Sequence, residues 1–137
     1  MIGFHSLNEF ALANQEELRT WIIEIIKEEN HTLGEINYVF CDDIDLLGLN
    51  KKYLDHDTLT DIISFDYTQG VVVSGDIYIS TERVKENATV FSVEFDYELR
   101  RVMAHGVLHY CGYKDKTEEE KTTMRMKEDY YLSSSPN

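Results

Sequence analysis

Apolar residues recur along this chain at two spacings, and together these predict a mixture of strands and helices. Between residues 18 and 26 the spacing is three and four, which is typical of one buried helix face; the positions are Leu18, Trp21, Ile22, Ile25 and Ile26. The preceding run, Asn14-Gln15-Glu16-Glu17, is similar to a capping box, so we expect the helix to begin there. Residues 2–10 are predicted to form a strand.

The middle of the chain shows strand-like alternation. After Gly34, Ile36, Tyr38 and Phe40 alternate with the residues between them as far as Cys41, which predicts a strand. Asp43 is expected to cap a short helix, and residues 54–60 are polar and predicted to form a loop. Two further strands are predicted at 61–67 and 71–80. They are joined by a turn at Gln69-Gly70, and Gly75 is a candidate bulge.

Three consecutive helices are predicted in the rest of the chain. Ser80 or Thr81 caps a helix to about Phe91, Ser92 caps a helix to Cys111, and the capping box 117–120 opens a helix to Leu132. The order β-α-β-α-β-β-α-α-α indicates an α+β fold with four strands and five helices. We expect a single domain over residues 1–132 and a disordered tail over 133–137.

Composition is that of a soluble globular protein. The chain has 137 residues, of which 42% are hydrophobic and 28% are charged. Its apolar runs are shorter than the roughly 20 residues that span a bilayer, and its beginning does not resemble a secretory signal. Cys41 and Cys111 are too few for a disulfide framework and fit a reducing compartment. We therefore expect a cytoplasmic protein without a membrane partner.

The net charge of −13 argues against general affinity for nucleic acid, because phosphate neutralisation drives non-specific binding. A local basic patch or a bound metal can offset this mean charge. Cations do gather around one segment, at Arg100, Arg101, Lys114, Lys116, Lys121, Arg125 and Lys127. Whether they form a functional patch or only solvated helix faces stays open at this point.

One motif predicts a metal site. His105 and His109 are four residues apart in a predicted helix, so both imidazoles leave the same face one turn apart. Gly112 then ends the helix, and Asp115 follows three residues later. Two imidazoles and a carboxylate with an open position are typical of zinc sites that activate water, although manganese, nickel or iron fit this donor set too.

Neighbouring residues limit the chemistry. In zinc proteases of the His-Glu-x-x-His type a general-base glutamate follows the first histidine, whereas this chain has Gly106, which weakens a peptidase interpretation. Glu98 shares the azimuth of the histidines and is a candidate base or ligand partner, but an exposed helix glutamate is the expected role. Cys111 lies about 160° around the helix from His109 and is not expected to be a ligand.

These residues resemble the YbeY family of bacterial endoribonucleases and rRNA maturation factors. The family motif His-Gly-x-Leu-His-x-x-Gly-Tyr-Asp-His is similar to residues 105–115 of this chain. Two upstream blocks, Leu49 to Tyr53 with Thr60 to Phe65, and Gly75 to Ser80, match in the same order. The resemblance spans about residues 36–130. It implies a small mixed sheet packed with helices, and a zinc-dependent endoribonuclease that cleaves single-stranded RNA.

The resemblance also implies a place in rRNA 3′-end maturation and ribosome quality control, with the small ribosomal subunit or its proteins as partners. Two departures from the family pattern bear on this. The third metal histidine of the family falls on Asp115 and the preceding aspartate on Lys114. The arginine that usually follows the tyrosine of the first block falls on Leu54, for which Lys51, Lys52 or Arg100 are candidate replacements.

Three functional hypotheses follow. The first is a metal-dependent endoribonuclease with His105, His109 and Asp115 as ligands of one zinc ion per chain. The second is a zinc metallopeptidase or another metallohydrolase. The third is a ribosome-associated factor without catalytic activity, in which a fourth ligand makes the metal structural.

Overall fold

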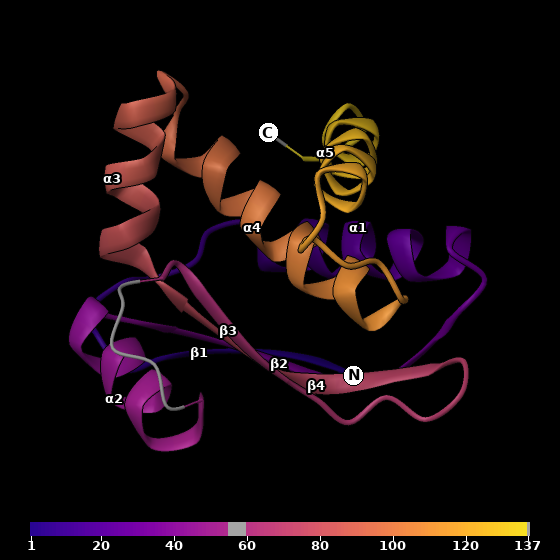
Figure 1. The fold of residues 1–137 in the computed structure, drawn as a ribbon, viewed down its shortest axis with the longest axis horizontal. Helices are drawn as coiled ribbons and strands as arrows, with labels where there is room; N and C mark the ends of the chain where they lie inside the picture. Colours follow the sequence, from indigo (N-terminus) through magenta and orange to yellow (C-terminus); the bar gives the residue numbers. More distant parts are fainter. Residues whose placement is uncertain (55–59, 137) are drawn as a thin grey trace.

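The computed structural model describes residues 1–54 and 60–136, and its elements follow the predicted order. The fold is the expected α+β arrangement (Figure 1). The described elements are β1 (Ile2–Ser6), α1 (Gln15–Glu28), β2 (Thr32–Cys41), α2 (Asp43–Leu54), β3 (Ile62–Asp66), β4 (Val72–Ser80), α3 (Thr81–Phe91), α4 (Phe95–Tyr110) and α5 (Glu118–Leu132). Of the predicted loop 54–60, residues 55–59 lie outside the described residues.

The sheet has the strand order β1-β2-β4-β3 and is mixed, as expected. β1 and β4 both run parallel to β2, and β3 pairs with β4 as an antiparallel hairpin. The register shifts between Leu33 and Ile36, so the irregularity falls on β2, beside the pairing partner of Gly75. β1 ends at Ser6, shorter than predicted, and the amide of Asn8 then donates to Asp42 (2.9 Å) and Thr81 (3.0 Å).

Helices lie on both sides of the sheet (Figure 1). α1 and α4 cover one side, with α3 and α5 flanking α4, and α2 lies on the other. Strand alternation separates two cores: Tyr38, Phe40 and Ile77 face the larger one under α1 and α4. Cys41 and Ile63 face the smaller core under α2. The long helix α4 is therefore fixed along most of its length, which matters because it carries both histidines of the candidate site.

Helix starts agree with the sequence at three places and differ at two. Ser80 caps α3, and Thr117 with Glu120 forms the predicted capping box of α5. α1 begins at Gln15 with Asn14 at its N-cap, as expected, although Asn14 takes a left-handed conformation (φ 58°) and its side chain makes no capping hydrogen bond. The predicted cap at Ser92 is wrong, because that residue ends α3 with φ 56° and α4 begins at Phe95.

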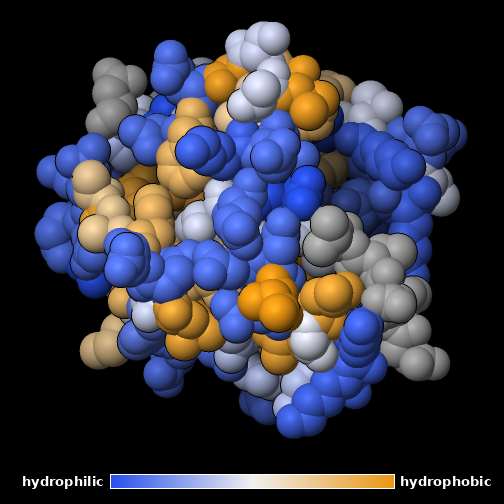
Figure 2. Space-filling view, turned by 90° about the vertical axis from the view of Figure 1, so that its left-hand side faces the viewer, coloured by the Kyte–Doolittle hydropathy of each residue, from blue (hydrophilic) through white to orange (hydrophobic). Residues whose placement is uncertain are grey.

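Asp43 does not cap α2 but is its first residue, and its carboxylate joins α2 to α3. That carboxylate accepts hydrogen bonds from the hydroxyl of Ser80 (2.7 Å) and the guanidinium of Arg83 (2.8 Å). The side of the molecule formed by α2 and α3 is shown in Figure 2. It is mainly hydrophilic, with apolar residues in small separate groups. None of the described helices is both long and apolar enough to cross a membrane.

Candidate metal centre

Helix α4 places the two histidines as predicted. His105 and His109 are one turn apart, and their Nε2 atoms approach to 2.9 Å. The rings are nearly perpendicular, with an interplanar angle of 80° and centroids 4.5 Å apart. Their side chains are 16% and 30% exposed, so the core holds the rings while one edge of each stays accessible.

A glycine-dependent reversal brings the third residue to the histidines. Gly112 has φ 104°, which L side chains rarely adopt. Its N–H donates to the carbonyl of His109, and the N–H of Tyr113 donates to that of Leu108, as in a Schellman motif. The chain turns back, and Asp115 approaches Nε2 of His105 to 3.2 Å and Nε2 of His109 to 3.7 Å. One ligand atom from each residue lies within 4.8 Å of the others.

The hydrogen bonds on the far side of each ring determine where the protons lie. Nδ1 of His109 is 2.8 Å from the carbonyl of Tyr113, which can only accept a hydrogen bond, so this nitrogen carries hydrogen. Nδ1 of His105 is 2.7 Å from a carboxylate oxygen of Glu128, which assigns its hydrogen in the same way. In the neutral rings both Nε2 lone pairs then face each other and the Asp115 carboxylate.

Such a convergence of electron pairs is stabilised by a cation. Burial lowers the pKa of His109, and the neighbouring His105 lowers it further, which disfavours protonation of the His109 ring. Two imidazole nitrogens and one carboxylate oxygen are instead the donor set of a divalent transition metal. The residues therefore fit the predicted ion by their chemistry as well as by their proximity.

A buried ionic network supports His105 from behind. Glu128 of α5 and Glu98 of α4 are 2% and 1% exposed. Arg101 lies between them, donating to Glu128 at 3.0 Å and forming an ion pair with Glu98. Burial alone would raise the pKa of Glu128, but the hydrogen bond with His105 and the charge of Arg101 outweigh it and hold the pKa below its usual value. Glu128 therefore stays ionised beside the ring.

The expectation that Glu98 is an exposed glutamate is wrong. Its partner is Arg101 rather than either histidine, so it acts on the site through that arginine. Sequence patterns do not single out Glu128 or Asp61 as site residues, and they indicate Arg101 only as one of several cations near the motif. The detectable sign for Glu128 was its spacing, since it follows Met124 by four residues on the buried stripe of α5.

A hollow of about 340 Å³ opens beside the histidines. Its wall includes Asp61, Ser64 and Arg101 as well as His105, His109 and Asp115. Burial raises the pKa of Asp61, while Arg101 and His105 oppose that shift. The volume is in the usual range for small-ligand sites, and all three candidate ligands lie in its wall.

Gly106 packs against the sheet, and Cys111 lies outside the group of clustered donors. A Cβ on Gly106 would lie 3.0 Å from Cδ1 of Ile77 and 3.2 Å from Cδ1 of Ile62, so the glycine lets α4 pack closely on the sheet. Burial raises the pKa of Cys111 to about 12, and this residue is not among the clustered donors.

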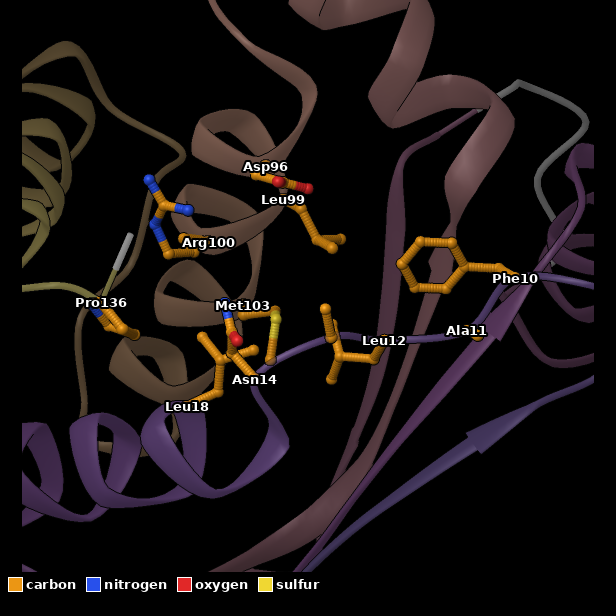
Figure 3. Close-up of a pocket in the computed structure, with 11 residues that line it drawn as sticks. Phe10, Ala11, Leu12, Asn14, Leu18, Asp96, Leu99, Arg100, Met103 and Pro136 are labelled. Carbon is orange, nitrogen blue, oxygen red and sulfur yellow. The ribbon is translucent and has the colours of Figure 1, made fainter.

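Arg100, one candidate replacement for the family arginine, lies elsewhere. Its Nε donates to the hydroxyl of Ser135 (3.1 Å). Figure 3 shows it beside a separate, mostly apolar pocket, near Pro136, Leu99 and Met103. That pocket has a volume of about 90 Å³ and is lined by none of the three clustered residues. Arg100 is thus not part of the candidate metal centre.

Comparison with known proteins gives consistent matches over the chain. The protein-family model described as "Endoribonuclease YbeY" matches residues 5–135. A protein of that name from Flavobacterium johnsoniae is 55% identical over 129 residues, covering 94% of this chain and 93% of the relative. Another from Christiangramia forsetii is 56% identical over 128 residues, covering 93% and 90%.

A solved structure agrees with the fold. The solution structure of a Thermotoga maritima protein superposes with a TM-score of 0.69 at 26% identity, covering 97% of this chain and 87% of that one. The similarity therefore extends over nearly the whole chain and is not limited to the histidine motif.

Proposed function

Because the chain belongs to the YbeY endoribonuclease family, we propose that it hydrolyses RNA phosphodiesters at a divalent metal held by His105, His109 and Asp115. One observation carries the proposal. The Nε2 atoms of His105 and His109 lie 2.9 Å apart, and each ring carries its hydrogen on Nδ1. The two Nε2 atoms converge with the Asp115 carboxylate at the edge of an open hollow. That arrangement is stabilised by a cation and leaves it accessible to substrate.

The donor set favours zinc, and manganese, nickel or iron are the other candidates. When bound, such an ion supplies Lewis acidity to water or to a phosphoryl oxygen. The protein's part is orientation. Glu128 accepts a hydrogen bond from Nδ1–H of His105, and the carbonyl of Tyr113 accepts one from Nδ1–H of His109, which directs both Nε2 atoms toward Asp115. Carboxylate and carbonyl partners of this kind fix the ring and raise ligand basicity.

The proposed substrate is single-stranded RNA, with rRNA 3′ ends and the small ribosomal subunit as its context. This part rests on family membership together with the resemblance of the motif blocks. Asp115 stands where the family has a third histidine. A metal site with this carboxylate carries one positive charge less than a site with three neutral imidazoles. We therefore expect water at this site to be less acidic than at a site with three histidines.

The rival hypotheses have less support. A zinc-peptidase glutamate at position 106 would have to share space with Ile62 and Ile77, against which the glycine packs. A structural metal requires a fourth protein ligand, and the described residues place three donors in the group. Ribosomal-subunit co-sedimentation without RNA cleavage would favour that structural alternative.

The direct test is cleavage of a fluorescent single-stranded RNA by the zinc-loaded protein, with and without chelator. We expect His109→Ala to lose both metal and cleavage. His5→Ala, a substitution at an exposed histidine on β1, serves as the control and should retain both. RNA cleavage by metal-free His109→Ala at the wild-type rate would exclude the proposed mechanism.

A further inference from the structure

A second hollow, of about 290 Å³, lies against the same cluster. Arg101, His105 and Asp115 line both hollows, so the candidate metal centre sits where the two meet. The first hollow continues toward Asp61 and Ser64, and the second continues along α5 past Lys121 and Arg125. A strand cleaved at the centre has nucleotides on both sides of the scissile phosphate, and two adjoining hollows offer room for both.

The second hollow carries a pair of cations. Lys121 and Arg125 are four residues apart on α5, so their side chains leave the same helix face one turn apart. They are 58% and 53% exposed, in contrast to the 11% of Arg101. Both charges are therefore accessible from the hollow.

The carboxylates near these cations form only long ion pairs with them. Nζ of Lys121 is 3.8 Å from Glu118, and Nη1 of Arg125 is 3.9 Å from Glu128. Glu128 is already committed at shorter range to Arg101 (3.0 Å) and His105 (2.7 Å). Exposed ion pairs at such distances contribute little, so a phosphate can displace them at small cost.

The charge of the whole chain makes such a local pair significant. With a net charge of −13, the protein repels RNA at long range, and binding needs cations close to the cleavage site. We propose that Lys121 and Arg125 form a phosphate subsite that holds the RNA backbone beside the scissile bond. This inference rests on the proposed function and assigns to it a binding surface on α5.

The salt dependence of RNA binding tests the subsite. Anisotropy of a fluorescent single-stranded RNA would be followed against salt concentration for zinc-loaded wild type and for Lys121→Gln with Arg125→Gln. Each lost phosphate contact lowers the slope of log K against log salt by about 0.7 for single strands, so the double variant should lose about 1.4. We also expect its KM for cleavage to rise while kcat and zinc content stay unchanged.

The control has the same charge change at a distance. Lys27→Gln with Lys85→Gln removes two exposed cations from α1 and α3 and should leave the slope near the wild-type value. If the two double variants had the same slope of log K against log salt and the same KM, the proposed subsite would be excluded, even in a protein that cleaves RNA. Binding with the predicted slope difference but without cleavage would support the subsite and contradict the proposed function.

Discussion

The carboxylate of Glu29, at the end of α1, accepts a hydrogen bond of 2.7 Å from the hydroxyl of Tyr113, 84 positions later in the chain. Tyr131 and Lys127 of α5 donate to the same carboxylate. Tyr113 lies two residues before Asp115 and orients His109 through its carbonyl. Glu29 is therefore an anchor for the loop that presents the third candidate ligand, although it lies outside the site itself.

The first prediction concerns that anchor. Tyr113→Phe removes the hydroxyl but keeps the ring and the carbonyl, so the Asp115 loop loses one hydrogen bond to a charged group, typically about 1.5–3 kcal/mol. We expect weaker zinc binding, by up to about tenfold, measured by competition with a fluorescent chelator. Tyr130→Phe, which loses a comparable bond to Glu28, is the control and should bind zinc like the wild type. Equal affinities for both variants would show that the anchor has no effect on the metal.

Glu29 also predicts how stability depends on acid. Burial alone raises its pKa, but hydrogen bonds from Tyr131, Tyr113 and Lys127 outweigh this and lower the pKa below 4.5 in the folded protein. The unfolded chain thus binds a proton on Glu29 more tightly than the folded protein does. The contribution of Glu29 to folding stability is therefore complete above about pH 5 and is lost as pH falls through the folded-state pKa. Glu29→Gln should lower stability at pH 7 by about 1–2 kcal/mol and flatten its decline below pH 5. Urea unfolding of wild type and Glu29→Gln at pH 7 and below pH 5 measures this effect. A decline in stability as steep as that of the wild type would contradict it.

A third prediction addresses Glu128. Glu128→Gln removes the charge that holds His105 and pairs with Arg101, so we expect a loss of about 10–100-fold in zinc affinity. Asp129→Asn makes the same change of charge one residue later on α5 and should leave zinc affinity unaltered. If the two variants bound zinc equally well, the buried carboxylate would have no part in orienting His105.

The fourth prediction concerns packing of α4 on the sheet. Gly106→Leu forces a side chain toward Ile77 and Ile62 and should destabilise the fold by about 1–3 kcal/mol. Gly48→Leu is the matched control on α2, where a Cβ would meet no other atom within 4 Å. Thermal unfolding of both variants would reveal the difference. A fully stable Gly106→Leu protein would mean that α4 has room for a side chain at this position.

The parts of the fold that depend on one periodic pattern could be predicted from the sequence. The stripe Leu18 to Ile26 and the capping box at Thr117 are local, and the structure confirms both. The histidine pair and the Gly112 reversal are local as well, which is why the cluster could be predicted. The prediction for Ser92 is wrong because a serine between two helices can begin one or end the other, and here its left-handed φ ends α3.

Long-range charge pairing could not be predicted from these patterns. Acidic residues on a helix are usually exposed, and Glu98 and Glu128 are buried because Arg101 neutralises both across two helices. The same holds for Glu29, whose partners come from two later segments. Such residues become visible once the packing of α1, α4 and α5 is known.

His105, His109 and Asp115 are proposed to hold one divalent ion together. The sharpest test is elemental analysis of purified, untagged wild type, His109→Ala and Asp115→Ala, with Asp129→Asn as a control for charge. We expect about one zinc per wild-type and control chain and a loss of metal from both site variants. Wild-type protein that stays metal-free after zinc supplementation, or Asp115→Ala that retains a full equivalent, would contradict the three-ligand site.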